Sequence, residues 1–351
     1  MRNVAEKCQV VKKQVLMIIS LFVSVVILIC ALIPSSILAD DNHSKETLKK
    51  VVKVGILQQL EHPSLDQVRE NFINDLKKAI EEKGSSLELD IQNAQNDVSN
   101  CQTIASQFAN KDLDLVMTLG TAASQAAAKE IKNVPIIASA VTDPLASRLV
   151  KSLEEPGSNV TAVSDLSSAE EQVKLLLAWK TDAKKVGIVY SSNEANSIQQ
   201  AELIRKELEK NGLESSDYTF SNSSELNSLL ETAMQAADAI YIPTDNTVAS
   251  SMPLVHKLEL EYKTAVIVAA QGMLEEGGLS CVGIDYRKLG SKTAETAIEI
   301  LIDGKDAGKI PVKYLDELDV MYREDTMEAL GLKLPDELKS RAESVEKSTA
   351  K

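Results

Sequence analysis

Short apolar runs alternate with longer amphipathic stretches over most of the chain. In the first half, the apolar runs lie at 52–58, 87–91, 113–119, 134–139 and 159–163, and the amphipathic stretches at 65–83, 98–110, 121–131 and 146–151. Runs that are apolar throughout predict strands covered on both faces, whereas the spacing of the longer stretches predicts helices. Strands that alternate with helices in this way indicate parallel βαβ units.

A second series of the same kind follows. Apolar runs at 186–190, 239–242 and 265–269, together with a predicted strand at 216–220, alternate with helical stretches at 195–211, 223–236 and 248–262, before a loop with three glycines. Two series in a chain longer than the usual single core predict two doubly wound lobes. The remaining segments are too few for a third lobe, and they fit as connections that cross between the two: 281–285, 288–302, 311–321 and 325–330.

The expected fold class is therefore α/β, with two doubly wound parallel-sheet lobes joined by several crossover segments. We assign residues 51–160 and 286–310 to lobe 1, and residues 161–285 and 311–335 to lobe 2. Residues 336–351 are expected to form a charged, frayed C-terminal tail.

Residues 1–39 have the pattern of an export signal. Basic residues at positions 2, 7, 12 and 13 precede an uncharged apolar run at 15–33, and Ala39 stands before the polar start at Asp40. The run is almost long enough to span a bilayer, so both cleavage after Ala39 and retention as an N-terminal anchor stay open. Lipid attachment at Cys30 is disfavoured, because Ile29 stands where a small residue is needed. In each case residues 40–50 form a polar tether, and the remainder lies at the extracytoplasmic face of the membrane.

Composition excludes several classes of function. Residues 1–39 hold four of the 38 basic and one of the 52 acidic residues, so residues 40–351 carry a net charge of −17, which opposes binding to nucleic acid. Cys101 and Cys281 have no disulfide framework around them, and we expect both to be free and buried. The scattered histidines offer no metal spacing, and no P-loop, nucleophile elbow or dinucleotide-binding motif is present. The sequence therefore predicts neither an enzyme nor a cofactor or metal site.

Polar residues gather in the loops that follow the predicted strands. In a doubly wound sheet, ligands bind beyond the carboxyl ends of the strands, so two facing lobes would enclose a polar cleft. The candidate ligand-binding residues come from these loops: Gln59, Leu60, Glu61, Thr121, Ala122, Ala123, Asp143, Asn196, Ser197, Asp245, Asn246, Gln271 and Asp285.

Three of these loops suggest how an amino acid could be held. The helix that starts at Thr121 can present its first amides to a carboxylate, although Thr121 can equally be a plain cap. Asn196 and Ser197 open a helix in the other lobe and can add donors, or merely cap it. Asp245 can accept an ammonium group, or cap the helix near Val248.

The loop motifs, taken in order, resemble a known family. They are Val54-Gly55-Ile56 with Glu61-His62-Pro63-Ser64-Leu65-Asp66, Asn93-Ala94-Gln95, Gly120-Thr121-Ala122, Thr142-Asp143-Pro144, Asn159-Val160-Thr161, Lys185-Val186-Gly187-Ile188-Val189-Tyr190, Ser192-Asn193-Glu194-Ala195-Asn196-Ser197, Pro243-Thr244-Asp245-Asn246-Thr247-Val248, Gly283-Ile284-Asp285-Tyr286 with Leu289-Gly290, and Ala329-Leu330-Gly331. Over residues 52–335 the chain looks like the ABC-transporter substrate-binding family that includes the tryptophan and tyrosine binding proteins. It departs from the family pattern at Ala122, Ala162 and Gln271, and the last of these removes a possible ammonium partner.

The resemblance implies a type I periplasmic-binding fold and a monomer that imports a small amino-acid-like solute, with an ABC permease and ATPase as membrane partners. It further implies an aromatic ligand, tryptophan or tyrosine. A stacking surface would come from Tyr190, Tyr241 or Tyr286, or from apolar walls such as Leu60 and Met273. An exported ligand-sensing domain for a signalling receptor, and a non-aromatic amino acid or nucleoside as ligand, remain alternatives. A transcription-regulator effector domain is disfavoured, because an apolar export segment stands where a DNA-binding domain would be.

Overall fold

The computed structural model describes residues 51–315 and 317–345. The expected export segment and polar tether lie outside these residues. Within them, no helix is both long and apolar enough to cross a membrane.

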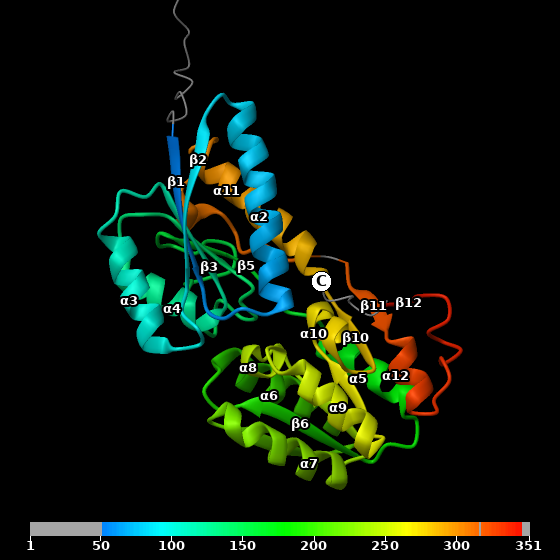
Figure 1. The fold of residues 1–351 in the computed structure, drawn as a ribbon. Helices are drawn as coiled ribbons and strands as arrows, with labels where there is room; N and C mark the ends of the chain where they lie inside the picture. Colours follow the sequence, from blue (N-terminus) through cyan, green and yellow to red (C-terminus); the bar gives the residue numbers. More distant parts are fainter. Residues whose placement is uncertain (1–50, 316, 346–351) are drawn as a thin grey trace, which may run out of the picture. The chain divides into compact units, whose positions relative to one another are not determined.

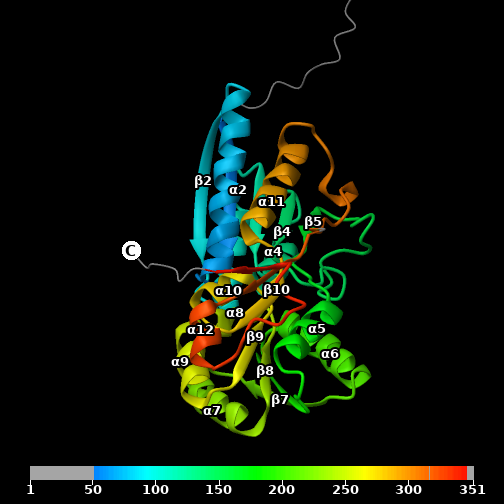
Figure 2. The same cartoon turned by 90° about the vertical axis from the view of Figure 1, so that its right-hand side faces the viewer.

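Residues 51–163 build the first sheet, which we call the sheet of lobe 1 (Figure 1). Its described strands are all parallel, in the order β2-β1-β3-β4-β5. Helices α3 and α4 pack against each other on one face (Figure 1), and α2 packs with the later helix α11 on the other (Figure 2). The bounds are β1 (Val51–Gln58), α2 (Pro63–Glu82), β2 (Ser86–Asn93), α3 (Val98–Ala109), β3 (Leu115–Leu119), α4 (Thr121–Glu130), β4 (Ile136–Ser139), β5 (Val160–Val163) and α11 (Tyr286–Leu301).

The second sheet belongs to lobe 2 and has the order β12-β11-β10-β9-β8-β6-β7. Among these strands the β10–β11 pair is antiparallel and the other pairs are parallel. Helices α5 and α6 pack together, as do α7 and α9. The bounds are α5 (Ala169–Trp179), β6 (Lys185–Ser191), α6 (Ala195–Lys210), β7 (Glu214–Phe220), α7 (Leu226–Ala236), β8 (Ala239–Ile242), α8 (Asn246–Ala249), α9 (Met252–Tyr262), β9 (Ala265–Val268), α10 (Gln271–Glu276), β10 (Ser280–Gly283), β11 (Asp319–Tyr322), α12 (Glu324–Ala329) and β12 (Ala342–Ser344).

The central strands of both sheets are buried on both faces, as continuous apolar runs require. Every residue of β3, β4, β8 and β9 is buried. The predicted α/β class with parallel sheets is therefore confirmed. Cys101 and Cys281 are free and buried, also as expected. Trp179 packs in the core of lobe 2, with its ring centroid 5.9 Å from that of Tyr322.

Crossover segments connect the lobes at the ends of β5 and β10 and before β11. The Ser164 amide donates to the Lys313 carbonyl (2.8 Å), and the Lys313 amide donates to the Ala162 carbonyl (3.0 Å). The Tyr286 hydroxyl, which follows β10, donates to the Asp165 carboxylate (2.7 Å). The crossovers thus lie side by side, as in a hinge.

Several predicted elements differ in the structure. Residues 146–151 form turns rather than a helix, because Arg148 adopts a left-handed φ of 58° that interrupts helical hydrogen bonding. The helix predicted at 248–262 is two helices, and the second starts with Pro253 in its first turn, a position that proline favours. The glycine loop after β9 contains the short helix α10.

Two expected boundaries of the lobes also change. The sheet of lobe 1 extends past residue 160, because β5 pairs with β4 as far as Val163. The C-terminal tail was expected to fray after residue 335, but β12 pairs with β11 in lobe 2. Hydrogen bonds from β11 hold residues 342–344 as a strand, although their charged sequence predicts little structure on its own.

Candidate functional site

A cleft of about 740 Å³ lies where the carboxyl ends of the strands in the two lobes face each other. Such a volume falls within the range of small-molecule sites. Of the candidate residues, Gln59, Thr121, Ala122 and Asn196 line this cleft. Its other walls come from the first turns of α3, α4 and α6 and from the end of β7, and include Gln95, Asn96, Glu194, Phe220 and Thr247.

The N-terminus of α4 faces the cleft from lobe 1. Gly120 holds the N-cap position with a φ of 91°, so Thr121 is not the cap, and within the described residues its buried hydroxyl has no hydrogen-bond partner. The Ala122 amide donates to Oε1 of Gln59 (3.0 Å). The φ of 91° explains the glycine, because side chains with a Cβ rarely adopt it, and a Cβ there would also lie 2.7 Å from the same oxygen. Gln59 therefore occupies the Ala122 amide in the first turn of α4, and a carboxylate that binds this amide must displace it.

Two buried acidic side chains of lobe 2 lie at the two sites: Glu194 lines the cleft, and Asp245 lies deeper, beside Asn196. Asp245 accepts hydrogen bonds from the amides of Ser191 (2.8 Å) and Val248 (2.9 Å), so it is the cap of α8 that the alternative interpretation proposed. Glu194 accepts from the backbone and side chains of both Asn246 and Thr247, at 2.7–2.9 Å. Burial, and then the nearby Glu194 carboxylate, raise the pKa of Asp245 to about 8.

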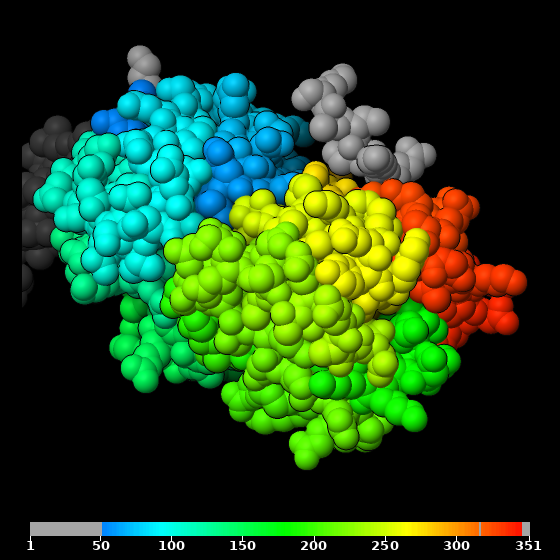
Figure 3. All heavy atoms as spheres, turned by 60° about the horizontal axis from the view of Figure 1, so that its bottom comes forward, coloured from blue at the N-terminus to red at the C-terminus, as the bar shows by residue number. Residues whose placement is uncertain are grey.

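The lobes touch each other directly on this side of the hinge. Side-chain hydrogen bonds that join them here include Asn96 Nδ2 to Thr247 Oγ1 (2.8 Å), His62 Nε2 to Asn246 Oδ1 (3.1 Å), Thr142 to Thr244 between hydroxyls (3.0 Å), and Gln67 Nε2 to Glu275 Oε2 (2.8 Å). The start of α2 also packs on α10, where the blue and yellow segments meet in Figure 3. The structure therefore represents the lobes in their closed arrangement.

A second, smaller cavity lies between the cleft and the hinge. It offers about 10 Å³ for a bound group, and Asn196 lines both it and the cleft. We call it the inner cavity. Its polar lining consists of His62, Ser64, Thr142, Asp165, Asn196, Thr244, Asp245 and Asn246, and its apolar lining of Leu65, Ala140, Ala249, Ala270, Met273 and Tyr286.

The residues at these two sites that were not predicted from the sequence include His62, Ser64, Asp165 and Glu194. His62 and Ser64 flank Pro63 in the loop after β1, and Glu194 stands directly before α6, so their positions after strands were visible signals. Asp165 had a weaker signal, because it follows β5 in what looked like a plain connection.

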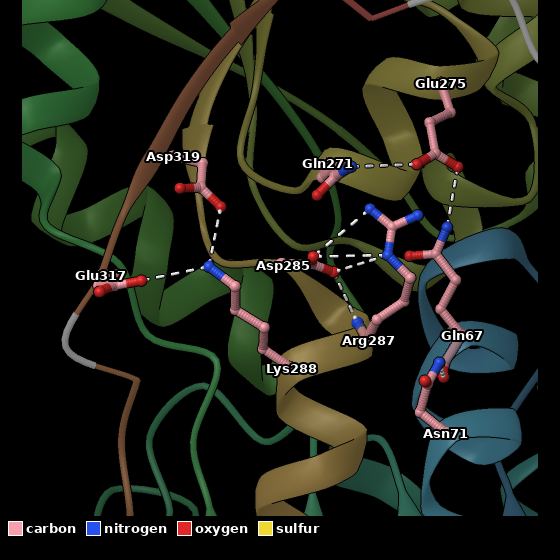
Figure 4. Close-up of polar contacts among 9 residues, drawn as sticks. All are labelled: Gln67, Asn71, Gln271, Glu275, Asp285, Arg287, Lys288, Glu317 and Asp319. Carbon is pink, nitrogen blue, oxygen red and sulfur yellow. Dashed lines mark hydrogen bonds and ion pairs between the residues drawn. The ribbon is translucent and has the colours of Figure 1, made fainter. Parts of the chain in front are cut away.

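Other candidate residues lie away from both sites. Asp285 caps α11 and pairs with Arg287 (3.2 Å), and Gln271 donates to Glu275 (3.3 Å), so both belong to a separate polar cluster (Figure 4). The Asp143 carboxylate accepts a hydrogen bond from the Ala146 amide (2.8 Å). The rest are placed as follows: Leu60 is half-buried and Glu61 exposed, Ala123 lies in the core of lobe 1, and Ser197 is buried beneath Asn196.

Only some of the residues expected to stack on an aromatic ligand lie at either site. Tyr190 and Tyr241 are in the core of lobe 2, whereas Tyr286 and Met273 line the inner cavity. No group of three or more His, Cys, Asp or Glu side chains among the described residues could hold a metal ion. The two sites therefore offer hydrogen bonds, charge and apolar walls to a ligand.

Comparisons with known proteins agree with this arrangement. Residues 53–346 match the family model described as ABC transporter substrate binding protein. A tyrosine-binding protein of Clostridioides difficile (strain R20291) is 41% identical over 294 residues, which cover 84% of this chain and 85% of that protein.

Solved structures give the same assignment. The ABC domain in complex with L-Trp from Streptococcus pneumoniae has a TM-score of 0.78 at 33% identity, and covers 84% of this chain and 100% of its own. The ligand-free, open structure of a substrate-binding protein with adhesive properties from Clostridium difficile has a TM-score of 0.65 at 39% identity. The match covers 85% of this chain and 100% of that one. Because the family model spans nearly all of the described residues, the chain belongs to the ABC transporter substrate-binding protein family and has its type I periplasmic-binding fold.

Proposed function

We propose that this protein is exported, binds an aromatic amino acid, tyrosine or tryptophan, between its lobes, and delivers it to an ABC importer. The observation that carries the proposal is the chemistry of the cleft and the inner cavity. Thr121 presents an unpaired hydroxyl from lobe 1 at the start of α4, where a carboxylate is favoured. Acidic side chains, Asp165 and Asp245, line the inner cavity, and a carboxylate there can pair with an ammonium group.

Apolar walls support an aromatic side chain. Phe220, Val98 and Ala126 line the cleft, which has room for a ring. Burying an aromatic ring against such walls contributes about 2–3 kcal/mol from area alone. The relatives point the same way, since one is named as a tyrosine-binding protein and another was solved with L-Trp.

Ligand binding is coupled to closure of the lobes about the hinge. The ligand-free, open relative overlays less well than the L-Trp complex, although it is more similar in sequence. A ligand closes the lobes only through contacts that the open form lacks. We therefore expect the ligand-free protein to populate an open form in solution.

A screen of the amino acids by thermal shift, followed by calorimetry, tests the proposal. L-tyrosine or L-tryptophan is expected to raise the melting temperature and to bind with a dissociation constant in the micromolar range or tighter. A ligand present at 100 times its dissociation constant stabilises by about 2.7 kcal/mol, which such a screen detects easily. If a nucleoside or an aliphatic amino acid raises the melting temperature while the aromatic ones leave it unchanged, the assignment is wrong.

A further inference from the structure

The inner cavity is surrounded by polar atoms that lack partners. His62, Ser64 and Asp165 all line it, and their exposed fractions are 7%, 2% and 5%. In the described part of the chain, His62 Nδ1, Ser64 Oγ and Asp165 Oδ1 have no hydrogen-bond partner. Buried polar atoms are nearly always hydrogen-bonded, because leaving one unpaired costs free energy. Three such atoms on the lining of one cavity indicate an occupant.

The network around His62 shows which proton it carries. Asn246 Nδ2 donates to Glu194 (2.7 Å), so Asn246 Oδ1 is the atom that meets His62 Nε2 at 3.1 Å. An amide oxygen only accepts, and Nε2 must therefore donate. Burial lowers the pKa of His62 and keeps the ring neutral. Its other nitrogen, Nδ1, is consequently a free acceptor.

Asp165 and Ser64 add acceptors of the same kind. Oδ2 of Asp165 accepts the Tyr286 hydroxyl (2.7 Å), and Oδ1 has no hydrogen-bond partner within the described residues. Burial raises the pKa of this carboxyl, whereas hydrogen bonds from Tyr286 and Thr142 oppose the rise, and a bound cation would oppose it further. The Ser64 hydroxyl oxygen also accepts. The cavity between them has room for a group about the size of one water molecule, about 10 Å³. A primary ammonium group has this size, a positive charge, and three N–H donors without an acceptor.

We propose that the inner cavity binds the primary ammonium group of the ligand, with the Asp165 carboxylate as its counter-ion and His62 Nδ1 and Ser64 Oγ as the other acceptors. This inference rests on the proposed function and identifies the group of the ligand that this part of the site recognises. The counter-ion of the ammonium is therefore Asp165 and not Asp245, which the sequence suggested. Both oxygens of Asp245 already accept backbone amides, at 2.8 and 2.9 Å, whereas Asp165 keeps one oxygen free.

The inner cavity adjoins the larger cleft at Asn196, which lines both. In the proposed complex, an ammonium group in the cavity places the rest of the ligand on the cleft side of Asn196, where Thr121 is available to its carboxylate. Closure of the lobes assembles the subsite, because His62 and Ser64 come from lobe 1 and Asp165 lies on a crossover. A bound water would also satisfy these atoms, but it would give no selectivity for a cation.

The first test uses the wild-type protein and varies the ligand. Calorimetry with L-tyrosine and L-tryptophan is compared with N-acetyl-L-tyrosine and with 3-(4-hydroxyphenyl)propionate, which lack the ammonium group. Loss of one partner of a buried charge pair is expected to weaken binding on the order of 100-fold. Tyramine, which keeps the ammonium and lacks the carboxylate, is expected to bind more tightly than either analogue.

The second test combines ligand and variant in one cycle. Asp165→Asn keeps the size of the side chain and an oxygen that can accept the Tyr286 hydroxyl. It is expected to weaken the binding of L-tyrosine on the order of 100-fold. In this variant, removal of the amino group from the ligand is expected to cost less than about fivefold, because the two changes delete the same interaction. Asp319→Asn is the matched control. Asp319 lies on β11 and pairs with the exposed Lys288, so this variant is expected to bind L-tyrosine within about twofold of the wild-type affinity.

The outcomes separate the two proposals. If wild type binds L-tyrosine or L-tryptophan but binds the corresponding amine-free analogue within about tenfold, the ammonium subsite is wrong and the proposed function stands. The same holds if Asp165→Asn binds as tightly as wild type, or keeps the full preference for the amino group. If wild type binds neither aromatic amino acid, both proposals are wrong. The wild-type arm decides the question even if Asp165→Asn lowers the melting temperature.

Discussion

The contact between Gly272 and Ser64 gives a direct test of lobe closure. Gly272 lies in α10 of lobe 2, and Ser64 lies at the start of α2 in lobe 1. A Cβ on Gly272 would stand 2.7 Å from the Ser64 amide nitrogen and 2.9 Å from its Cα, and it would also meet the hydroxyl. Backbone atoms at these distances cannot move aside as a flexible side chain could. Gly272→Ala should therefore hold the lobes apart while leaving each lobe intact.

The size of the effect follows from overpacking. Forcing a methyl group into a packed contact costs about 1–3 kcal/mol. If the lobes open to relieve it, this cost appears in ligand binding as about a 5- to 150-fold weaker affinity. Calorimetry with the aromatic amino acid that binds wild type measures the loss. Small-angle scattering with both proteins saturated with ligand should show a larger radius of gyration for Gly272→Ala than for wild type.

Gly290→Ala is the matched control. Its Cβ would lie 2.5 Å from the Val68 carbonyl, but this contact joins α11 and α2 within lobe 1. Gly290→Ala should lower the melting temperature by a few degrees and leave affinity nearly unchanged. If Gly272→Ala binds the ligand as tightly as wild type, the contact between α10 and α2 is not part of the ligand-bound form.

Three further predictions concern single features. Asp97 accepts hydrogen bonds from the amides of Ser99 and Asn100 at the start of α3, so Asp97→Ala should cost about 1 kcal/mol and lower the melting temperature by a few degrees in calorimetric scans. Burial raises the pKa of Cys101 to about 11, and that of Cys281 further, so in a chain of residues 40–351 neither thiol should react with a disulfide reagent at pH 8 until denaturant is added. Sequencing of the mature N-terminus should begin near Asp40, and an unprocessed cytoplasmic protein would contradict the proposed export.

The sequence determined the elements and their order. Hydrophobic periodicity reports burial, and burial on both faces is what the central strands of a parallel sheet require, so β3, β4, β8 and β9 were all predicted close to their actual bounds. The loops after these strands followed from the same pattern, and with them the placement of a cleft between two lobes. Helix caps such as Asp245 were visible as well, because capping depends on neighbours within a few residues.

The tertiary structure decided which polar groups remain free. Asp245 looked available for a ligand, but the Ser191 amide, from a different strand, uses one of its oxygens. The Ala122 amide looked equally available, yet Gln59 from β1 occupies it. In both cases the partner is remote in sequence, so no local pattern could show that the group was already satisfied.

The same reason explains why Asp165 was missed and Asp285 was chosen. Both are acids at crossovers, directly after buried strands. In the fold, Asp285 caps α11 and pairs with Arg287, whereas Asp165 turns toward the inner cavity and keeps an oxygen free. The sequence by itself determined where polar residues follow strands; only the tertiary structure decided which of them lack a partner, because hydrogen bonding is completed by groups that folding brings together from distant parts of the chain.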